Sequence, residues 1–151
     1  MKFMMNGAVT VATLDGANVE IHREVGDENI VLFGLRSDEV IAYQKNGNYS
    51  AAEVIRSDPR LQRLLRQLQE GYFGLAPQHE FDLIVKHLTE ENDPYFTLKD
   101  FDAYVRAQER INTLYADRNA WNKMSVINTA ASGVFSSDNT IRKYADEIWN
   151  V

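Results

Sequence analysis

The hydrophobic pattern of this chain changes character at Gly34. Before it, two runs consist almost entirely of apolar and β-branched residues, the first from Val9 to Leu14 and the second from Ile30 to Phe33. Short continuous runs rich in β-branched residues are typical of strands buried on both faces. Between the runs, Asp15 can cap a helix that ends at Gly26. Strand, helix and strand with short connections predict a right-handed parallel βαβ unit.

After Gly34 the apolar residues recur at helical spacing. The clearest helix begins with Asp58 as a cap and Pro59 in its first turn, and it stops before Gly71. Its apolar stripe consists of Leu61, Leu64, Leu65 and Leu68. Further helices are predicted from Ser37 to Gly47, Ser50 to Arg56, Phe81 to Leu88, Asp100 to Tyr115, Asp117 to Gly133, and from Ser136 onward. The segment from Gly71 to Gln78 is predicted to be a loop anchored by Tyr72, Phe73 and Leu75.

Length and composition predict one domain and an ordinary globular protein. The chain has 151 residues, of which 44% are hydrophobic and 25% charged, and it has no cysteine. Disulfides and thiolate sites are therefore excluded. The net charge of -6 argues against nucleic acid as a partner, because phosphate-backbone binding needs clustered cations. With no signal-like or membrane-length apolar segment, a cytoplasmic location with no membrane partner is the expectation.

Lys2 is the main candidate for chemistry, because a lysine amine can condense with an aldehyde such as that of pyridoxal phosphate. Taken alone, a lysine at this position is more often a solvated side chain. The three histidines, His22, His79 and His87, have no metal-ligand spacing, and His22 is interpreted as an exposed helical residue. The carboxylate clusters are most simply helix caps and solvated turns. We therefore assign no metal ligand and no catalytic residue.

The residues around Lys2 nevertheless carry a long resemblance. Lys2-Phe3-Met4, Asn6-Gly7-Ala8 and the run from Thr13 to Glu20 resemble the segment of glycogen and maltodextrin phosphorylases that begins at their pyridoxal lysine. The resemblance extends along the whole chain. It is carried further by Glu28-Asn29, Phe33-Gly34, Gln108-Glu109-Arg110, Trp121, Ser132-Gly133, Phe135 to Asp138 and Ile148-Trp149. The chain is therefore similar to the C-terminal part of an α-glucan phosphorylase.

This resemblance implies a fold and a function. Residues 1–151 would be a C-terminal fragment of the second, cofactor-carrying domain, an α/β domain of the Rossmann-like glycosyltransferase-B type, with one βαβ unit followed by a mainly helical region. The intact enzyme would release glucose 1-phosphate from glycogen, starch or maltodextrin with inorganic phosphate. Lys2 would hold pyridoxal phosphate, whose phosphate group acts beside the substrate phosphate as the acid-base group.

The resemblance also sets expectations for the isolated chain. The family's glycine-rich phosphate-binding segment lies before the lysine, so the chain alone is expected to bind the cofactor weakly and to be inactive. The partial sheet is expected to present unpaired strand edges, and the last helix to expose Tyr144, Ile148 and Trp149. Both features predict self-association, either through the strand edges or by exchange of the terminal helix, and a homo-oligomer. The alternative, from another functional class, is a helical interaction module with no catalytic role.

Overall fold

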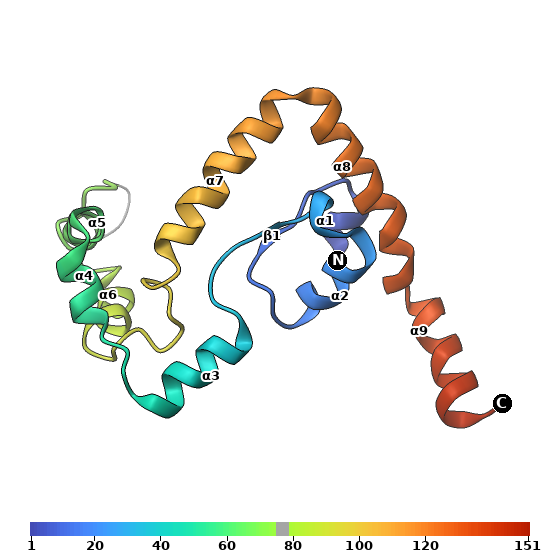
Figure 1. Cartoon of the computed structure of the whole chain (residues 1–151), viewed down its shortest axis with the longest axis horizontal. Helices are drawn as coiled ribbons and strands as arrows, with labels where there is room; N and C mark the ends of the chain where they lie inside the picture. The colour runs from blue at the N-terminus through green and yellow to red at the C-terminus, as the bar shows by residue number, and fades with distance from the viewer. Residues whose placement is uncertain (75–78) are drawn as a thin grey trace. The chain divides into compact units, whose positions relative to one another are not determined.

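A computed structural model describes residues 1–74 and 79–151. The contacts within the chain group it into two compact units, residues 1–33 with 105–151 (unit 1) and residues 34–104 (unit 2). Figure 1 traces the elements of both units along the chain. None of the helices in the described ranges is long and apolar enough to cross a membrane.

Unit 1 is built on the predicted βαβ unit. Its first elements are α1 (Lys2–Met5), β1 (Val11–Ala12), α2 (Ala17–Val25), the 3-10 turn η1 (Asp27–Asn29) and β2 (Val31–Leu32). The two strands pair in parallel, with Val11 opposite Val31 and Ala12 opposite Leu32, which confirms the predicted parallel arrangement. The chain is thus a mainly helical α/β structure with a two-stranded sheet. Each strand is shorter than the apolar run that predicted it.

The rest of unit 1 comes from the far end of the sequence. It comprises most of α7 (Phe101–Ala116), then α8 (Arg118–Ala131), the 3-10 turn η2 (Ser132–Phe135), α9 (Ser137–Tyr144) and the π-helical turn η3 (Ala145–Trp149). Asp117 accepts from the backbone N–H groups of Asn119 and Ala120, and Ser136 accepts from that of Asn139, so both predicted caps are confirmed. Helix α8 ends at Ala131 with Ser132 as its C-cap, so Gly133 lies just beyond the helix end as expected, within the 3-10 turn η2.

The core of unit 1 joins the first helices to α8. Its fully buried members are Met4, Ile21, Val25 and Ile30, and the partly buried side chains packed on them are Leu32, Ile127, Ala131 and Phe135. Residues from α1, α2 and the start of β2 therefore share one apolar cluster with residues from α8 and η2. In Figure 1, α8 runs beside α1 and α2. Burial of this cluster is what ties the two distant sequence segments of unit 1 together.

Unit 2 is helical, as its spacing predicted. It contains α3 (Ser37–Asn46), α4 (Ala51–Ser57), α5 (Pro59–Gln69), α6 (Asp82–Thr89) and the first residues of α7. Leu61 and Leu65 of the leucine stripe are buried, and the core cluster joins Leu61 to Ala51 and Leu98. The predicted caps of α4 and α5 are confirmed, since Ser50 accepts from Glu53 N–H at 3.3 Å and Asp58 from Arg60 N–H at 2.9 Å.

Two local predictions differ from the structure. Asp15 does not cap α2: its carboxylate accepts a hydrogen bond from the Thr13 hydroxyl at 2.7 Å, and Gly16 occupies the cap position. Tyr72 and Phe73 do not anchor their loop. They remain 66% and 52% exposed: their rings contact each other edge to face, and the ring of Phe73 also contacts that of Phe81. The third predicted anchor, Leu75, lies outside the described residues.

Candidate functional site

The position of Lys2 follows from the burial of Met4. In an α-helix successive residues are about 100° apart, so residues two positions apart point to nearly opposite sides. Met4 is 2% exposed and lies in the core of unit 1. Lys2 is consequently directed outward, and its side chain is exposed. The apolar side chain of Phe3, next to it, is 82% exposed.

Helix α1 is short, but its backbone is tied to the turn that follows. The N–H of Gly7 donates to the Met4 carbonyl at 3.1 Å, and the N–H of Ala8 donates to the Phe3 carbonyl at 3.0 Å. Gly7 has φ +82°, a left-handed conformation that glycine adopts without steric cost. This turn ends the helix and sends the chain toward β1. The segment that carries Lys2 is therefore an ordered helical turn.

Helix α8 holds this turn from the other side. The Ser125 hydroxyl donates to the Gly7 carbonyl at 2.8 Å. A Cβ atom added at Gly7 would lie 2.6 Å from the Ser125 Oγ, closer than any normal contact. Both the backbone angle and the space at this position therefore require glycine.

One turn farther along α8, Asn128 holds the connection before β2. Its side chain is fully buried, and its amide donates to the Asn29 carbonyl at 2.7 Å and to the Met124 carbonyl at 2.9 Å. Its Oδ1 is buried and accepts no hydrogen bond from the described residues. Because residues three apart lie on the same side of a helix, Ser125 and Asn128 form one polar row on the inner side of α8.

The three histidines are paired with carboxylates on the surface. His22 contacts Asp27 at 2.5 Å, and neither Glu20 nor Glu24, so the pairing is with the turn after its helix. His79 contacts Asp82 at 2.8 Å, and His87 contacts Glu91. Within residues 1–74 and 79–151, no group of three or more potential ligands is placed to hold a metal ion.

The surroundings of Lys2 fit a covalently attached aldehyde cofactor. The side chain is exposed and makes no ion pair within the described ranges, so its amine is available to a partner. The backbone beneath it is fixed by the buried Met4 and by the hydrogen bonds of the Gly7 turn. A fixed backbone and an accessible amine are what an anchoring lysine needs.

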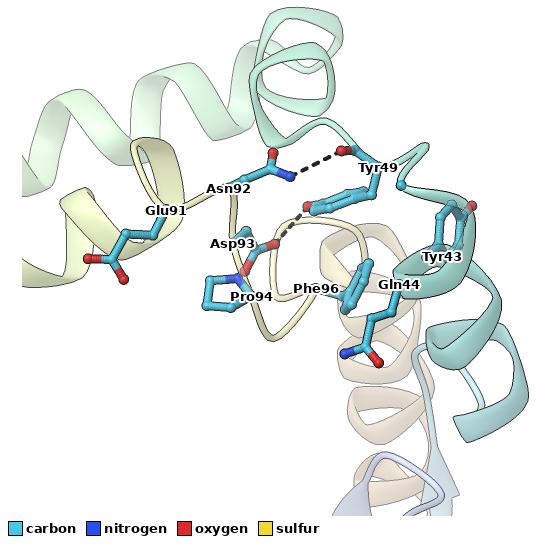
Figure 2. A pocket seen from close by; sticks show the side chains of 9 residues that line it. Tyr43, Gln44, Tyr49, Glu91, Asn92, Asp93, Pro94 and Phe96 are labelled. Carbon is cyan, nitrogen blue, oxygen red and sulfur yellow. Dashed lines mark hydrogen bonds between the residues drawn. The ribbon is translucent and has the colours of Figure 1, made fainter.

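A second candidate site lies in unit 2 and was not predicted from the sequence. A hollow of about 320 Å³ lies beside the turn that precedes α7. Figure 2 shows side chains that line it. It is lined by Tyr43, Gln44, Gly47, Tyr49, Glu91, Asn92, Asp93, Pro94 and Phe96. Asn92, Asp93 and Phe96 have positive φ angles, which are uncommon for residues other than glycine. Such clustered strain can mark a functional site or a tightly held turn.

The polar groups of this hollow are used to build the turn. Asp93, 1% exposed, accepts from the Tyr49 hydroxyl at 2.7 Å and from the N–H groups of Thr97 and Leu98 at 2.9 and 2.7 Å. Burial and the hydrogen bond to Asp93 both raise the pKa of Tyr49 far above its usual value. Asn92 donates to the Tyr49 carbonyl, as Figure 2 shows. These bonds hold the strained turn, and we assign the hollow a structural role.

Comparison with known proteins shows which family this chain resembles. The family model for carbohydrate phosphorylase matches residues 1–151. The chain is 49% identical to a glycogen phosphorylase of Bacillus subtilis, 44% identical to the human liver form and 38% identical to that of Chlamydia pneumoniae. Each match covers 100% of this chain and 18% or 19% of the relative. The chain therefore spans about a fifth of the length of these curated relatives.

Proposed function

The chain belongs to the carbohydrate phosphorylase family, and we propose on that basis that it forms part of an α-glucan phosphorylase in which Lys2 holds pyridoxal phosphate. The observation that carries the proposal is the exposed lysine on a helix fixed by its neighbour Met4. The full enzyme would transfer a terminal glucosyl unit from glycogen, starch or maltodextrin to inorganic phosphate. It would act in the cytoplasm.

The residues of this chain would supply attachment and orientation. Lys2 would bind the cofactor through its amine, and Met4 would keep the amine directed away from the core. The turn at Gly7 would keep the helix from unwinding toward β1. When bound, pyridoxal phosphate would supply a phosphate group that acts as acid and base beside the substrate phosphate. No carboxylate of the described residues is assigned a catalytic role.

The proposal includes the domain to which the chain belongs. Parallel β1 and β2 with α2 between them are consistent with the last βαβ part of a Rossmann-like domain of the glycosyltransferase-B type. We assign residues 1–151 to the second, cofactor-carrying domain. The remaining strands of that sheet would come from other parts of the full-length protein. Those parts would correspond to the roughly four fifths of the relatives that this chain does not match.

A phosphorolysis assay tests the proposed function. The full-length protein, supplied with pyridoxal phosphate, maltoheptaose and inorganic phosphate, is expected to form glucose 1-phosphate. The matched control omits inorganic phosphate, and no sugar phosphate should then appear. Release of free glucose at the same rate with and without phosphate would identify a hydrolase and contradict the proposal.

We also propose that the chain associates through the apolar side of its last helix. Ile141, Tyr144, Ile148 and Trp149, on α9 and the turn η3, are between 45% and 63% exposed, and several exposed apolar side chains on one terminal segment favour an interaction surface. The isolated 17.3 kDa chain is expected to form dimers or larger species at micromolar to millimolar concentration, measured by light scattering. Ile148→Glu should shift it toward monomer, whereas Val126→Glu, an exposed residue on α8, serves as the matched control. A monomer mass for the parent chain across that range would contradict this expectation.

A further inference from the structure

We propose that Ser125 is a positioning residue for Lys2, acting through the carbonyl of Gly7. This inference rests on the proposed role of Lys2 as the cofactor lysine. Ser125 and Gly7 are 118 positions apart in the sequence, yet a 2.8 Å hydrogen bond joins them. Helix α8 is far from Lys2 in the sequence, yet this bond lets it fix the position of the segment that carries the Lys2 amine.

The link from Ser125 to Lys2 runs through short, fixed backbone. Gly7 donates its N–H to the Met4 carbonyl, and Ala8 donates to the Phe3 carbonyl, so a movement of the turn moves the carbonyls of α1. Lys2 lies one residue before Phe3. Helix α1 has only four residues, and an isolated helix of that length is not stable in water. It therefore depends on the bonds that hold the turn and on Met4 in the core.

The contact is also sterically tight. A Cβ atom added at Gly7 would lie 2.6 Å from the Ser125 Oγ and 3.7 Å from the Thr129 Oγ1. The hydroxyl of Ser125 therefore occupies the space over Gly7, and removing it opens a gap above the turn. Loss of the hydroxyl also leaves the Gly7 carbonyl without this donor. Both effects allow the turn, and with it the lysine, to move.

Helix α8 is itself held in place, so that it can act as a support. Asn128 donates to the Asn29 carbonyl, and Asp117 caps the start of α8. Met124, one helical turn before Asn128, is buried. A hydroxyl on a fixed helix defines a position more accurately than one on a loop, and correct placement of a reacting amine governs its rate.

The test measures attachment of the cofactor in the full-length enzyme carrying this chain. After the cofactor is removed, pyridoxal phosphate is added back, the product is fixed by borohydride reduction at timed intervals, and the modified lysine is identified by peptide mass mapping. Ser125→Ala is expected to slow attachment at Lys2 about tenfold, because a misplaced amine reacts more slowly. Ser125→Thr keeps the hydroxyl and should restore most of the rate. Thr129→Ala is the matched control, since its hydroxyl donates only to the Ser125 carbonyl within α8.

Each outcome is decisive. Attachment to Lys2 at the parent rate in a folded Ser125→Ala variant would overturn this inference and leave the proposed function intact. Attachment to a lysine other than Lys2 in the parent enzyme would overturn the proposed role of Lys2 and this inference with it. Should Ser125→Ala fail to fold, Ser125→Cys, of similar size and with only a weak S–H donor, takes its place. Slow attachment in Ser125→Cys with recovery in Ser125→Thr supports the inference, and equal rates in both contradict it.

Discussion

Lys2→Ala in the full-length enzyme is expected to abolish covalent attachment of pyridoxal phosphate and to lower phosphorolysis by at least about a hundredfold, because the cofactor then lacks its fixed position. The exposed Lys2 side chain on α1 supports no core contact, so its removal should leave the fold unchanged. Glucose 1-phosphate formation under saturating cofactor, with the thermal unfolding of both proteins as a reference, measures the effect.

Two variants sharpen this comparison. Lys2→Arg keeps a positive charge but offers no amine that condenses with an aldehyde, so it should be as inactive as Lys2→Ala. Lys45→Ala removes an exposed lysine from α3 of unit 2 and should retain the parent activity. Activity of Lys2→Ala within about tenfold of the parent, without any added amine, would rule out the proposed anchoring role.

The 151-residue chain alone is expected to show no measurable phosphorylase activity. Phosphate, cofactor and glucan must be fixed in contact with one another, and losing that placement costs many orders of magnitude in rate. The chain matches about a fifth of the length of its relatives, and the proposed role of Lys2 is limited to attaching the cofactor. The assay incubates the purified chain with pyridoxal phosphate, maltoheptaose and phosphate.

The control for this prediction is Lys2→Ala in the same isolated chain. Both chains should match the blank without protein. Turnover by the parent chain that disappears in Lys2→Ala would show a self-sufficient site and contradict the prediction. Turnover that is unchanged by the substitution would not depend on Lys2 and would indicate a contaminating enzyme.

Much of the local structure could be predicted because it depends on short-range chemistry. Asp58 and Pro59 start α5 as expected, since a capping carboxylate and a proline in the first turn act within a few residues. The same holds for Asp117 at the start of α8. The parallel pairing of β1 and β2 followed from two apolar runs joined by a helix.

The missed features depend on contacts between distant segments. Nothing near Gly7 in the sequence indicates that Ser125 would bind it, because 118 positions separate the pair. The buried Asp93 was interpreted as part of a polar turn, and its partner Tyr49 lies 44 positions away. The clue available for Asp93 was its place before a proline, which favours a turn but does not predict burial.

The burial of Met4 and the helix α1 that carries Lys2 also could not be predicted from nearby residues. The motif identified the lysine, but its position two residues before Met4 gave no sign that Met4 would be buried. The sequence pattern did not predict α1, because four residues are too few for a periodic pattern. The apolar cluster with α2, β2 and α8 decides that this segment is a helix.

The most direct measurement of the central claim is the identity of the lysine that carries the cofactor in the full-length enzyme. Borohydride reduction of the enzyme with bound pyridoxal phosphate, followed by proteolysis and mass mapping, locates that residue. The account predicts one pyridoxyl group for each chain, on the peptide that contains Lys2. A modified residue elsewhere, with Lys2 unmodified, would contradict it.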